Sequence, residues 1–259
     1  MKPLKIGEVI FDDGSFNICA TLTPGTVEEL RKDLNTLKGR AFSIIEWRAD
    51  SLLLTSRLSE EIATGMRLIK EVFPEKPLIF TYRWKEEGGQ TSLEPKELFR
   101  IRREIVEQNL ADILDIEMYW FRNAQNEENL DAYFSLVKEA KKKGMKVLLS
   151  WHDFSNTPDE EQLLRIFRTQ EKLNADLAKV AVAAVVESDV DRLMTASFRI
   201  AQSLTIPHIA LSMGDLGKRS RYDRKRSMTC VTFAPAHNPS APGQLPLDEL
   251  HERLNEEQE

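Results

Sequence analysis

One lysine interrupts an otherwise apolar stretch of this 259-residue sequence. Lys179 stands inside Leu177–Val182, among leucine, alanine and valine. A lone lysine in such a stretch usually reaches toward water or pairs with a carboxylate. A neutral amine there would attack a carbonyl carbon and form an imine (Schiff base), but an ordinary lysine is almost fully protonated at pH 7. Burial and a neighbouring Arg48 or Arg83 would favour the neutral amine, so Lys179 is the strongest candidate nucleophile.

A histidine follows another apolar run and offers acid–base chemistry. His152 lies in Ser150–Phe154. A lone histidine at the end of a strand is more often a satisfied hydrogen-bonding group, but imine chemistry needs a proton shuttle, and imidazole titrates in the right range. Glu87 lies on an earlier loop and either orients that ring or is simply solvated. The sequence has four histidines and none form a close ligand pair, so we expect no metal site.

A basic segment, 217–226, follows the seventh apolar run. The ordinary interpretation is a solvated helix face, and a nucleic-acid patch is weakly supported because aromatic residues do not interleave with the basic ones. One arginine of the segment, Arg221, is instead a candidate for bidentate recognition of a carboxylate. The segment 234–244 is rich in proline and predicts a loop, of a kind that often closes over a site.

The elements that must position these groups are visible as a repeating pattern. Short apolar runs, mostly continuous rather than alternating, are typical of parallel strands covered on both faces. Eight such runs occur: Asn17–Leu22, Ser43–Trp47, Pro77–Tyr82, Asp112–Met118, Met145–Trp151, Leu177–Val182, Pro207–Met213 and Thr229–Phe233.

Helical patterns separate the runs. Thr26–Glu29 and Thr157–Glu160 have the sequence of capping boxes. Eight strand–helix units in one chain of this length predict a single (β/α)₈ (TIM) barrel domain over residues 1–259. No Gly-x-Gly-x-x-Gly turn supports an open dinucleotide-binding sheet. Lys5–Phe11, with Asp13-Gly14 as its turn, predicts an N-terminal β-hairpin that closes the bottom of the barrel.

The polar residues named above collect at the carboxyl ends of these strands. Glu46 and Arg48 end the second run, Arg83 follows the third, and His152 follows the fifth. In a (β/α)₈ barrel these ends converge on one mouth, where active sites are built. Charged groups gathered there are costly to desolvate, so a purely structural purpose is disfavoured.

Composition narrows the classes of protein further. The net charge is −6, which gives no general attraction to nucleic acid or to anionic lipid. No stretch is apolar over the roughly 20 residues that a membrane span needs, and no signal peptide is evident. Cys19 and Cys230 are therefore expected to be buried, reduced thiols, although one disulfide stays possible. These features predict a cytoplasmic protein.

Several separate motifs, in order, resemble type I 3-dehydroquinate dehydratase (3-dehydroquinase) of the shikimate pathway. The resemblance covers nearly the whole chain and is carried by Glu46-Trp-Arg-Ala-Asp50, Phe80-Thr-Tyr-Arg83, Glu87-Gly-Gly89, Asp115-Ile-Glu-Met118, Ser150-Trp-His-Asp153, Lys179-Val-Ala-Val182, Ser212-Met-Gly-Asp-Leu-Gly217, Ser220-Arg221, Thr232-Phe-Ala234 and Ser240-Ala-Pro-Gly-Gln244. Each motif alone is weak, and the ordered set is specific.

The resemblance implies a role for each site residue. Lys179 would form the imine, and His152 would be the general acid and base, oriented by Glu87. The substrate-binding residues would be Glu46, Arg48 and Arg83 for the ring hydroxyls, Arg221 for the carboxylate, Met213 and Phe233 for the pocket wall, and Ser240 and Gln244 on the closing loop. It also implies a small-molecule substrate, 3-dehydroquinate, no cofactor, no metal, and a homodimer.

Two other functions stay open. A class I aldolase also uses a barrel lysine imine, and Arg221 would then bind a phosphate, although Glu46, Arg48 and Arg83 suit a polyhydroxylated ring better. A catalytically dead barrel that only binds an anionic metabolite is the alternative outside enzymes, and the presence of Lys179 together with His152 disfavours it.

Overall fold

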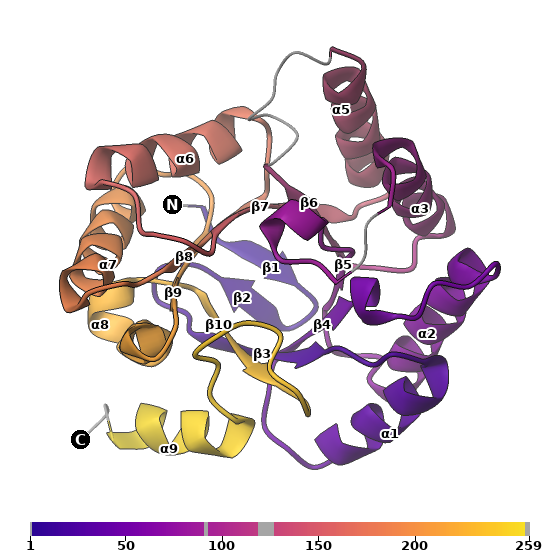
Figure 1. The fold of residues 1–259 in the computed structure, drawn as a ribbon, viewed down its shortest axis with the longest axis horizontal. Coiled ribbons are helices and arrows are strands. Elements are labelled where there is room, and N and C mark those ends of the chain that lie inside the picture. Colours follow the sequence, from indigo (N-terminus) through magenta and orange to yellow (C-terminus); the bar gives the residue numbers. More distant parts are fainter. Residues whose placement is uncertain (1, 91–92, 119–126, 257–259) are drawn as a thin grey trace.

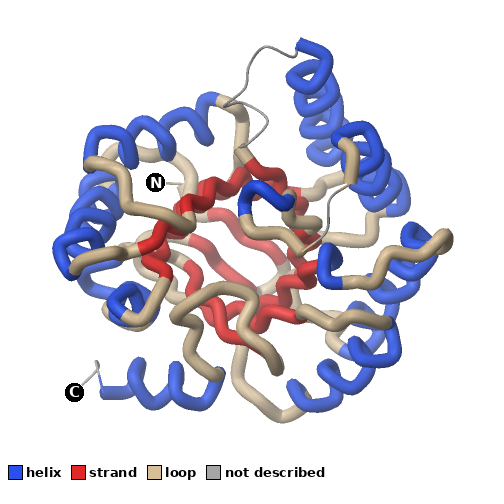
Figure 2. Tube along the Cα trace, in the orientation of Figure 1, coloured by secondary structure: helices blue, strands red, loops and turns tan. Residues whose placement is uncertain are grey.

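Eight parallel strands form the centre of the computed structural model, which describes residues 2–90, 93–118 and 127–256. The strands are β3 (Asn17–Leu22), β4 (Ile44–Arg48), β5 (Leu78–Thr81), β6 (Ile113–Glu117), β7 (Lys146–Asp153), β8 (Leu177–Ala183), β9 (His208–Met213) and β10 (Val231–Pro235). They pair in the order β10-β3-β4-β5-β6-β7-β8-β9 and make the ring seen in Figure 2. The Cys230 N–H donates to the His208 carbonyl at 3.1 Å where β9 meets β10, so the ring is nearly closed. The predicted (β/α)₈ barrel is confirmed.

Helices surround this ring on the outside (Figure 1). They are α1 (Val27–Leu37), α2 (Leu58–Val72), α3 (Pro95–Gln108), α5 (Glu127–Lys142), α6 (Glu160–Lys172), α7 (Glu187–Ala201), α8 (Arg224–Ser227) and α9 (Leu247–Glu256), with 3₁₀ turns η1 (Ala49–Ser51), η2 (Lys85–Glu87) and η3 (Leu216–Arg221). None of those described is long and apolar enough to cross a bilayer. Their apolar faces bury the outward side chains of the strands.

Neither predicted capping box is complete, because at the first one the Glu29 carboxylate accepts the Gly25 N–H at 2.7 Å instead of the Thr26 N–H. Thr26 caps α1, and its hydroxyl accepts the Glu29 N–H at 3.1 Å. For α6 the cap is Asp159, which accepts the Gln162 N–H at 2.8 Å. Thr157 instead donates to the Ala183 carbonyl at 2.7 Å, so it links the β7–α6 loop to the end of β8. The Thr157 hydroxyl thus bonds to a residue distant in sequence, whereas the local pattern predicted that it would cap the helix.

The N-terminal hairpin is present, but its turn was misplaced. Strands β1 (Leu4–Ile6) and β2 (Val9–Phe11) pair with Ile6 opposite Val9, so the turn is Gly7-Glu8, with Gly7 at φ +58°. Asp13-Gly14 lies in the connection to β3, where the Asp12 carboxylate accepts the Gly14 N–H at 3.0 Å in an Asx turn. Phe11 is fully buried against the lower residues of the barrel interior, so the hairpin closes its N-terminal end (Figure 1).

The barrel interior changes from apolar to polar along the strands. The lowest inward residues are Cys19, Ile44, Ile79, Ile113, Leu148, Leu177, Ile209 and Val231. Side chains of a strand alternate between its two faces, so the inward position two residues further on faces the same interior. Those positions include Glu46, Thr81, Asp115, Ser150 and Lys179. The apolar floor therefore supports a polar layer that opens toward the mouth.

Both cysteines are buried and free, as expected. Cys19 belongs to that apolar floor, and Cys230 packs with the same group of residues. Burial raises the pKa of each thiol, so both are kept protonated and unreactive at neutral pH. They play no part in the chemistry derived below.

A buried histidine makes the stability of the fold depend on pH. His208 is fully buried at the start of β9, its Nε2 lies 2.7 Å from the Ser197 hydroxyl, and burial lowers its pKa to about 4 from 6.5. The unfolded chain therefore binds the proton more readily, so stability falls as pH drops below about 6.5. We expect this histidine to account for a loss of about 2 kcal/mol between pH 7 and pH 5, at 1.36 kcal/mol per pKa unit. Urea titrations of the wild type and of His208→Gln measure it. An equally steep loss in the variant would assign the effect to other groups.

Candidate active site

All eleven site residues predicted from the sequence line one cavity at the carboxyl ends of the strands. They are Glu46, Arg48, Arg83, Glu87, His152, Lys179, Met213, Arg221, Phe233, Ser240 and Gln244. Phe154, Ala181, Leu211 and Ala241 complete the lining. Their convergence follows from the barrel, because the inward positions of neighbouring strands face a common interior. The roles that the sequence assigned to them stay predictions.

The Lys179 amine lies deep in this cavity. Its Nζ is 3.5 Å from Glu46 Oε1 and 4.0 Å from the centroid of the Phe233 ring, and the residue is 5% exposed. The nearest charged group is thus a carboxylate, whereas we expected an arginine. Arg48 and Arg83 are each engaged by other carboxylates. The Phe233 ring and the Glu46 carboxylate hold the amine in place, and Lys179 still lines the cavity.

The His152 ring is held by Glu87. Glu87 ends the 3₁₀ turn η2, and its Oε2 lies 2.8 Å from His152 Nδ1 and accepts the His152 backbone N–H at 3.0 Å. A carboxylate at Nδ1 favours the tautomer with the proton on that nitrogen, which makes Nε2 the nitrogen able to accept a proton. The geometry is that of a general base with an orienting carboxylate.

Asp50 joins two segments that carry arginines. It is fully buried in η1, and its carboxylate receives Arg48 Nε and Nη2, both at 2.8 Å. It also accepts the backbone N–H groups of Arg83 at 3.0 Å and Gln90 at 3.2 Å. Burial would raise the pKa of Asp50, but Arg48 and these hydrogen bonds outweigh it and lower the pKa. Asp50 therefore stays ionised and fixes Arg48 against the β5 loop.

Arg83 is the centre of a second buried network. Its Nη2 donates to Asp115 at 2.6 Å, its Nη1 donates to Ser150 at 2.7 Å, and Nη1 is 3.4 Å from Glu117. Burial alone would lower the pKa of Arg83, but Asp115, Glu117 and Glu87 raise it above its usual value. Asp115 is buried too, yet Arg83, Lys179 and Ser150 hold its pKa below the usual range. This network fixes the position of the Arg83 guanidinium in the wall of the cavity.

Arg221 is different, because among the described residues it has no carboxylate partner. It is 2% exposed at the end of η3, and its Nη2 donates to the Pro242 carbonyl at 3.2 Å. Burial lowers its pKa to about 10, so the guanidinium stays charged at neutral pH while lacking an anion. A ligand carboxylate in the cavity would supply that anion.

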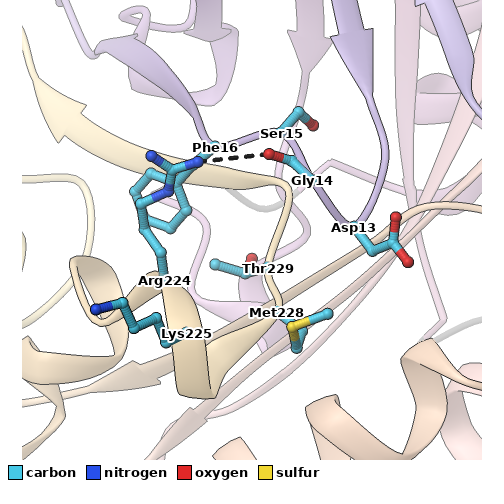
Figure 3. A pocket seen from close by; sticks show the side chains of 8 residues that line it. All are labelled: Asp13, Gly14, Ser15, Phe16, Arg224, Lys225, Met228 and Thr229. Atoms are coloured by element: carbon cyan, nitrogen blue, oxygen red, sulfur yellow. Dashed lines mark hydrogen bonds between the residues drawn. The ribbon is translucent and has the colours of Figure 1, made fainter. Parts of the chain in front are cut away.

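The rest of the basic segment faces elsewhere. Lys218 pairs with Asp215 at 2.9 Å, and Arg219 and Arg226 both pair with Asp191 at 2.9 Å. Arg224 lies over the Phe16 ring and donates to the Gly14 carbonyl at 3.4 Å. That contact lies beside a second cavity, of about 420 Å³, near the amino ends of β3 and β10 (Figure 3). These basic residues thus belong to the solvated surface, which is the ordinary interpretation of such a segment.

The loop that carries Ser240 and Gln244 packs over the mouth. Gln244 Oε1 accepts the Ser240 N–H at 2.7 Å, and the Pro242 carbonyl accepts the Gly214 N–H at 3.2 Å. Gly243 has φ +77°, and a Cβ on it would lie 2.3 Å from the Gly214 carbonyl oxygen. Glycine is required at this contact, which sets the loop directly on the end of β9.

Four buried residues that support the site carry a signal in the sequence. Asp50, Asp115, Glu117 and Ser150 all lie in the motifs above, although the resemblance implies no role for them. Asp115 and Ser150 stand two positions before Glu117 and His152, and so share their inward face. Across the described ranges, no three His, Cys, Asp or Glu side chains are grouped as a metal ion would need. The arrangement offers an amine nucleophile, an oriented imidazole and a guanidinium without a carboxylate partner among the described residues.

Residues 18–259 match the sequence model of the family described as Type I 3-dehydroquinase. The chain is 34% identical over 257 residues to 3-dehydroquinate dehydratase of Clostridium novyi, covering 98% of both chains. It is 32% identical over 253 residues to the enzyme of that name from Klebsiella pneumoniae, covering 97% of both.

Solved structures of 3-dehydroquinate dehydratases are similar to this chain over nearly its whole length. The 3-dehydroquinate dehydratase of Geobacillus kaustophilus superposes with a TM-score of 0.88 at 29% identity, covering 99% of this chain and 96% of that one. A type I 3-dehydroquinate dehydratase of Clostridium difficile, solved with covalently modified comenic acid, gives 0.86 at 28% identity, covering 98% and 96%. The chain belongs to the type I 3-dehydroquinase family.

Proposed function

We propose that this chain is the 3-dehydroquinate dehydratase of the shikimate pathway, converting 3-dehydroquinate to 3-dehydroshikimate and water through a Schiff base on Lys179. One observation carries the proposal: a buried lysine amine and a carboxylate-oriented imidazole, from neighbouring strands, share one cavity with a guanidinium that has no carboxylate partner in the described part of the chain. The family membership supplies the substrate.

The reaction uses these groups in turn. The Lys179 amine attacks the ketone carbon, and loss of water from the adduct leaves a protonated imine. The imine is a strong electron sink, so His152 Nε2 can remove the proton on the adjacent carbon and give an enamine. The enamine then expels the β-hydroxyl group, which leaves as water with the proton that His152 returns, in a syn elimination. A second water hydrolyses the product imine and frees Lys179.

Recognition of the substrate follows from the charges that line the cavity. Arg221 binds the carboxylate, since that anion completes its pairing, and Ser240 and Gln244 reach the same end. Glu46, Arg48 and Arg83 bind the ring hydroxyls, with the two arginines already fixed by Asp50 and Asp115. Met213 and Phe233 contact the ring itself. A fixed ring presents the correct hydrogen to the imidazole.

The loop over the mouth acts as a lid in this proposal. The cavity holds about 40 Å³ in the described conformation, which is room for only a few water molecules. A substituted six-membered ring needs more room, so Ser240–Gln244 must move for the substrate to enter and then return. Closure would exclude water from the imine and bring Ser240 and Gln244 to the carboxylate.

Gly243→Ala tests the lid. The added Cβ cannot fit against Gly214, so the loop can no longer close, and we expect kcat/KM for 3-dehydroquinate to fall by about 10- to 100-fold. Thermal melting should change little. Gly39→Ala is the matched control, because Gly39 has a similar φ of +79° but nothing within 4 Å of the new Cβ. Equal effects of the two substitutions would remove closure from the explanation.

The function itself is tested by borohydride reduction. Incubation of the wild type with 3-dehydroquinate and borohydride should add a reduced ligand to the peptide that holds Lys179, as read by mass spectrometry of a digest. Turnover without any adduct would rule out imine catalysis. Adducts and turnover with sugar phosphates alone would indicate an aldolase, and an adduct with no product would indicate a dead barrel.

The setting of the enzyme completes the proposal. We infer a single barrel domain over residues 1–259 that works in the cytoplasm as a homodimer, without a cofactor. The proposed place in the shikimate pathway supports the location, and the family resemblance supports the dimer. Sedimentation equilibrium of the purified chain would measure the dimer directly.

A further inference from the structure

An arginine outside the barrel is buried completely and only partly paired. Arg102 lies on α3 with no exposed surface, and its Nη2 donates to Glu117 and, at 3.2 Å, to the Tyr82 carbonyl. Its Nε and Nη1 are also shielded from solvent and have no partner among the described residues. A buried guanidinium costs several kcal/mol to desolvate, and one carboxylate does not reliably offset that cost. Stability alone is therefore a poor reason for a charge at this position.

Glu117 connects Arg102 to the cavity. One of its oxygens receives Arg102, and the other accepts the Trp84 N–H at 2.9 Å and lies 3.4 Å from Arg83 Nη1. Glu117 thus stands between two arginines, one on a helix and one lining the cavity. Arg83 in turn is closer to Asp115 and Ser150, at 2.6 and 2.7 Å. Two guanidinium groups and two carboxylates balance one another in this interior.

We propose that Arg102 is a positioning residue: by holding Glu117, it prevents that carboxylate from drawing Arg83 away from Asp115 and Ser150. Without the charge of Arg102, the nearest cation to the buried Glu117 carboxylate would be Arg83. Attraction between opposite charges is strong in a buried site that water does not screen. Arg83 would then move toward Glu117 and away from the position in which it binds the substrate hydroxyls. Arg102 does not line the cavity and acts only through these two side chains.

The kinetic consequence rests on the proposed function and separates binding from chemistry. In Arg102→Met and in Arg102→Gln we expect KM for 3-dehydroquinate to rise about 10- to 100-fold, with kcat changed by less than about fivefold. The Gln variant keeps a donor for the Tyr82 carbonyl and is the one to use if the Met variant does not fold. A merely structural role would lower the melting temperature and leave KM of the folded enzyme unchanged.

A double substitution gives the sharpest discrimination. In Arg102→Met/Glu117→Gln the neutral amide no longer attracts Arg83, while its oxygen can still accept the Trp84 N–H. Removal of both partners should therefore return KM to within about threefold of the wild type. Arg103→Met is the matched control, since Arg103 is the next residue of α3 and pairs at the surface with Glu139 at 3.4 Å. Its KM should match that of the wild type.

Two results would overturn the proposal: a wild-type KM in both single variants, or a double variant as impaired as Arg102→Met. A crystal structure of Arg102→Gln adds a readout that needs no substrate. The Arg83 guanidinium should lie closer to Glu117 and leave Ser150, and an unmoved guanidinium would contradict the inference. Failure of the wild type to turn over 3-dehydroquinate would instead contradict the proposed function and leave this structural comparison intact.

Discussion

Replacement of Lys179 by alanine is expected to abolish both turnover of 3-dehydroquinate and the borohydride-trapped adduct. The amine is the only group in the proposed reaction that bonds to the substrate, so every later step depends on it. Loss of a nucleophile of this kind lowers kcat by about 10⁴- to 10⁶-fold. Steady-state assays measure the first effect, and mass spectrometry of the reduced, digested protein measures the second.

The alanine substitution also removes buried side-chain volume, and a matched variant separates that loss from the loss of the amine. Lys179→Met fills most of the side-chain volume without the amine, and Glu46 keeps its hydrogen bonds from Thr21 and Thr81 in either variant. Both variants should lose the adduct. Lys146→Met changes a lysine at the opposite end of a neighbouring strand and should keep both activity and adduct. An adduct that persists in Lys179→Ala would place the imine on another lysine.

The barrel could be predicted because its signals are local and repeated. Each buried parallel strand is a short apolar run, and eight such runs at this length leave few other architectures. The same regularity predicted the site, since strand ends converge and Lys179, His152 and Arg83 each stand at or near one. What failed were contacts that local sequence does not determine. Thr157 bonds to Ala183 rather than capping a helix, and the hairpin turns at Gly7 rather than at Asp13.

The pairing of the buried charges around the site was harder to predict. The sequence predicted that arginines would neighbour Lys179, but Arg48 and Arg83 are each held by a carboxylate, and Glu46 is the group beside the amine. Pairing among buried charges depends on distances across strands and helices. Arg102 shows this most clearly: its partner Glu117 lies on a different element, and nothing in the helix pattern of α3 marks it as more than one arginine among several.

His152→Ala is expected to slow the reaction by about 10²- to 10⁴-fold, because one imidazole serves both the proton abstraction and the departure of the hydroxyl group. Imine formation and hydrolysis also move protons, so the approach to a trapped adduct should be slower as well. Rapid-quench trapping over time measures both, alongside steady-state kcat.

The alanine variant also deprives Glu87 of the ring at 2.8 Å, so the rate loss alone does not show that His152 transfers a proton. His152→Asn resolves this, because an asparagine amide can donate to Glu87 in place of Nδ1 but does not titrate near neutral pH. If the imidazole is the acid and base, Asn should be as slow as Ala. If His152 only orders Glu87 and the loop around it, Asn should restore most of the rate. Wild-type turnover in the alanine variant would exclude His152 from the chemistry, since no proton acceptor would then stand where the mechanism requires one.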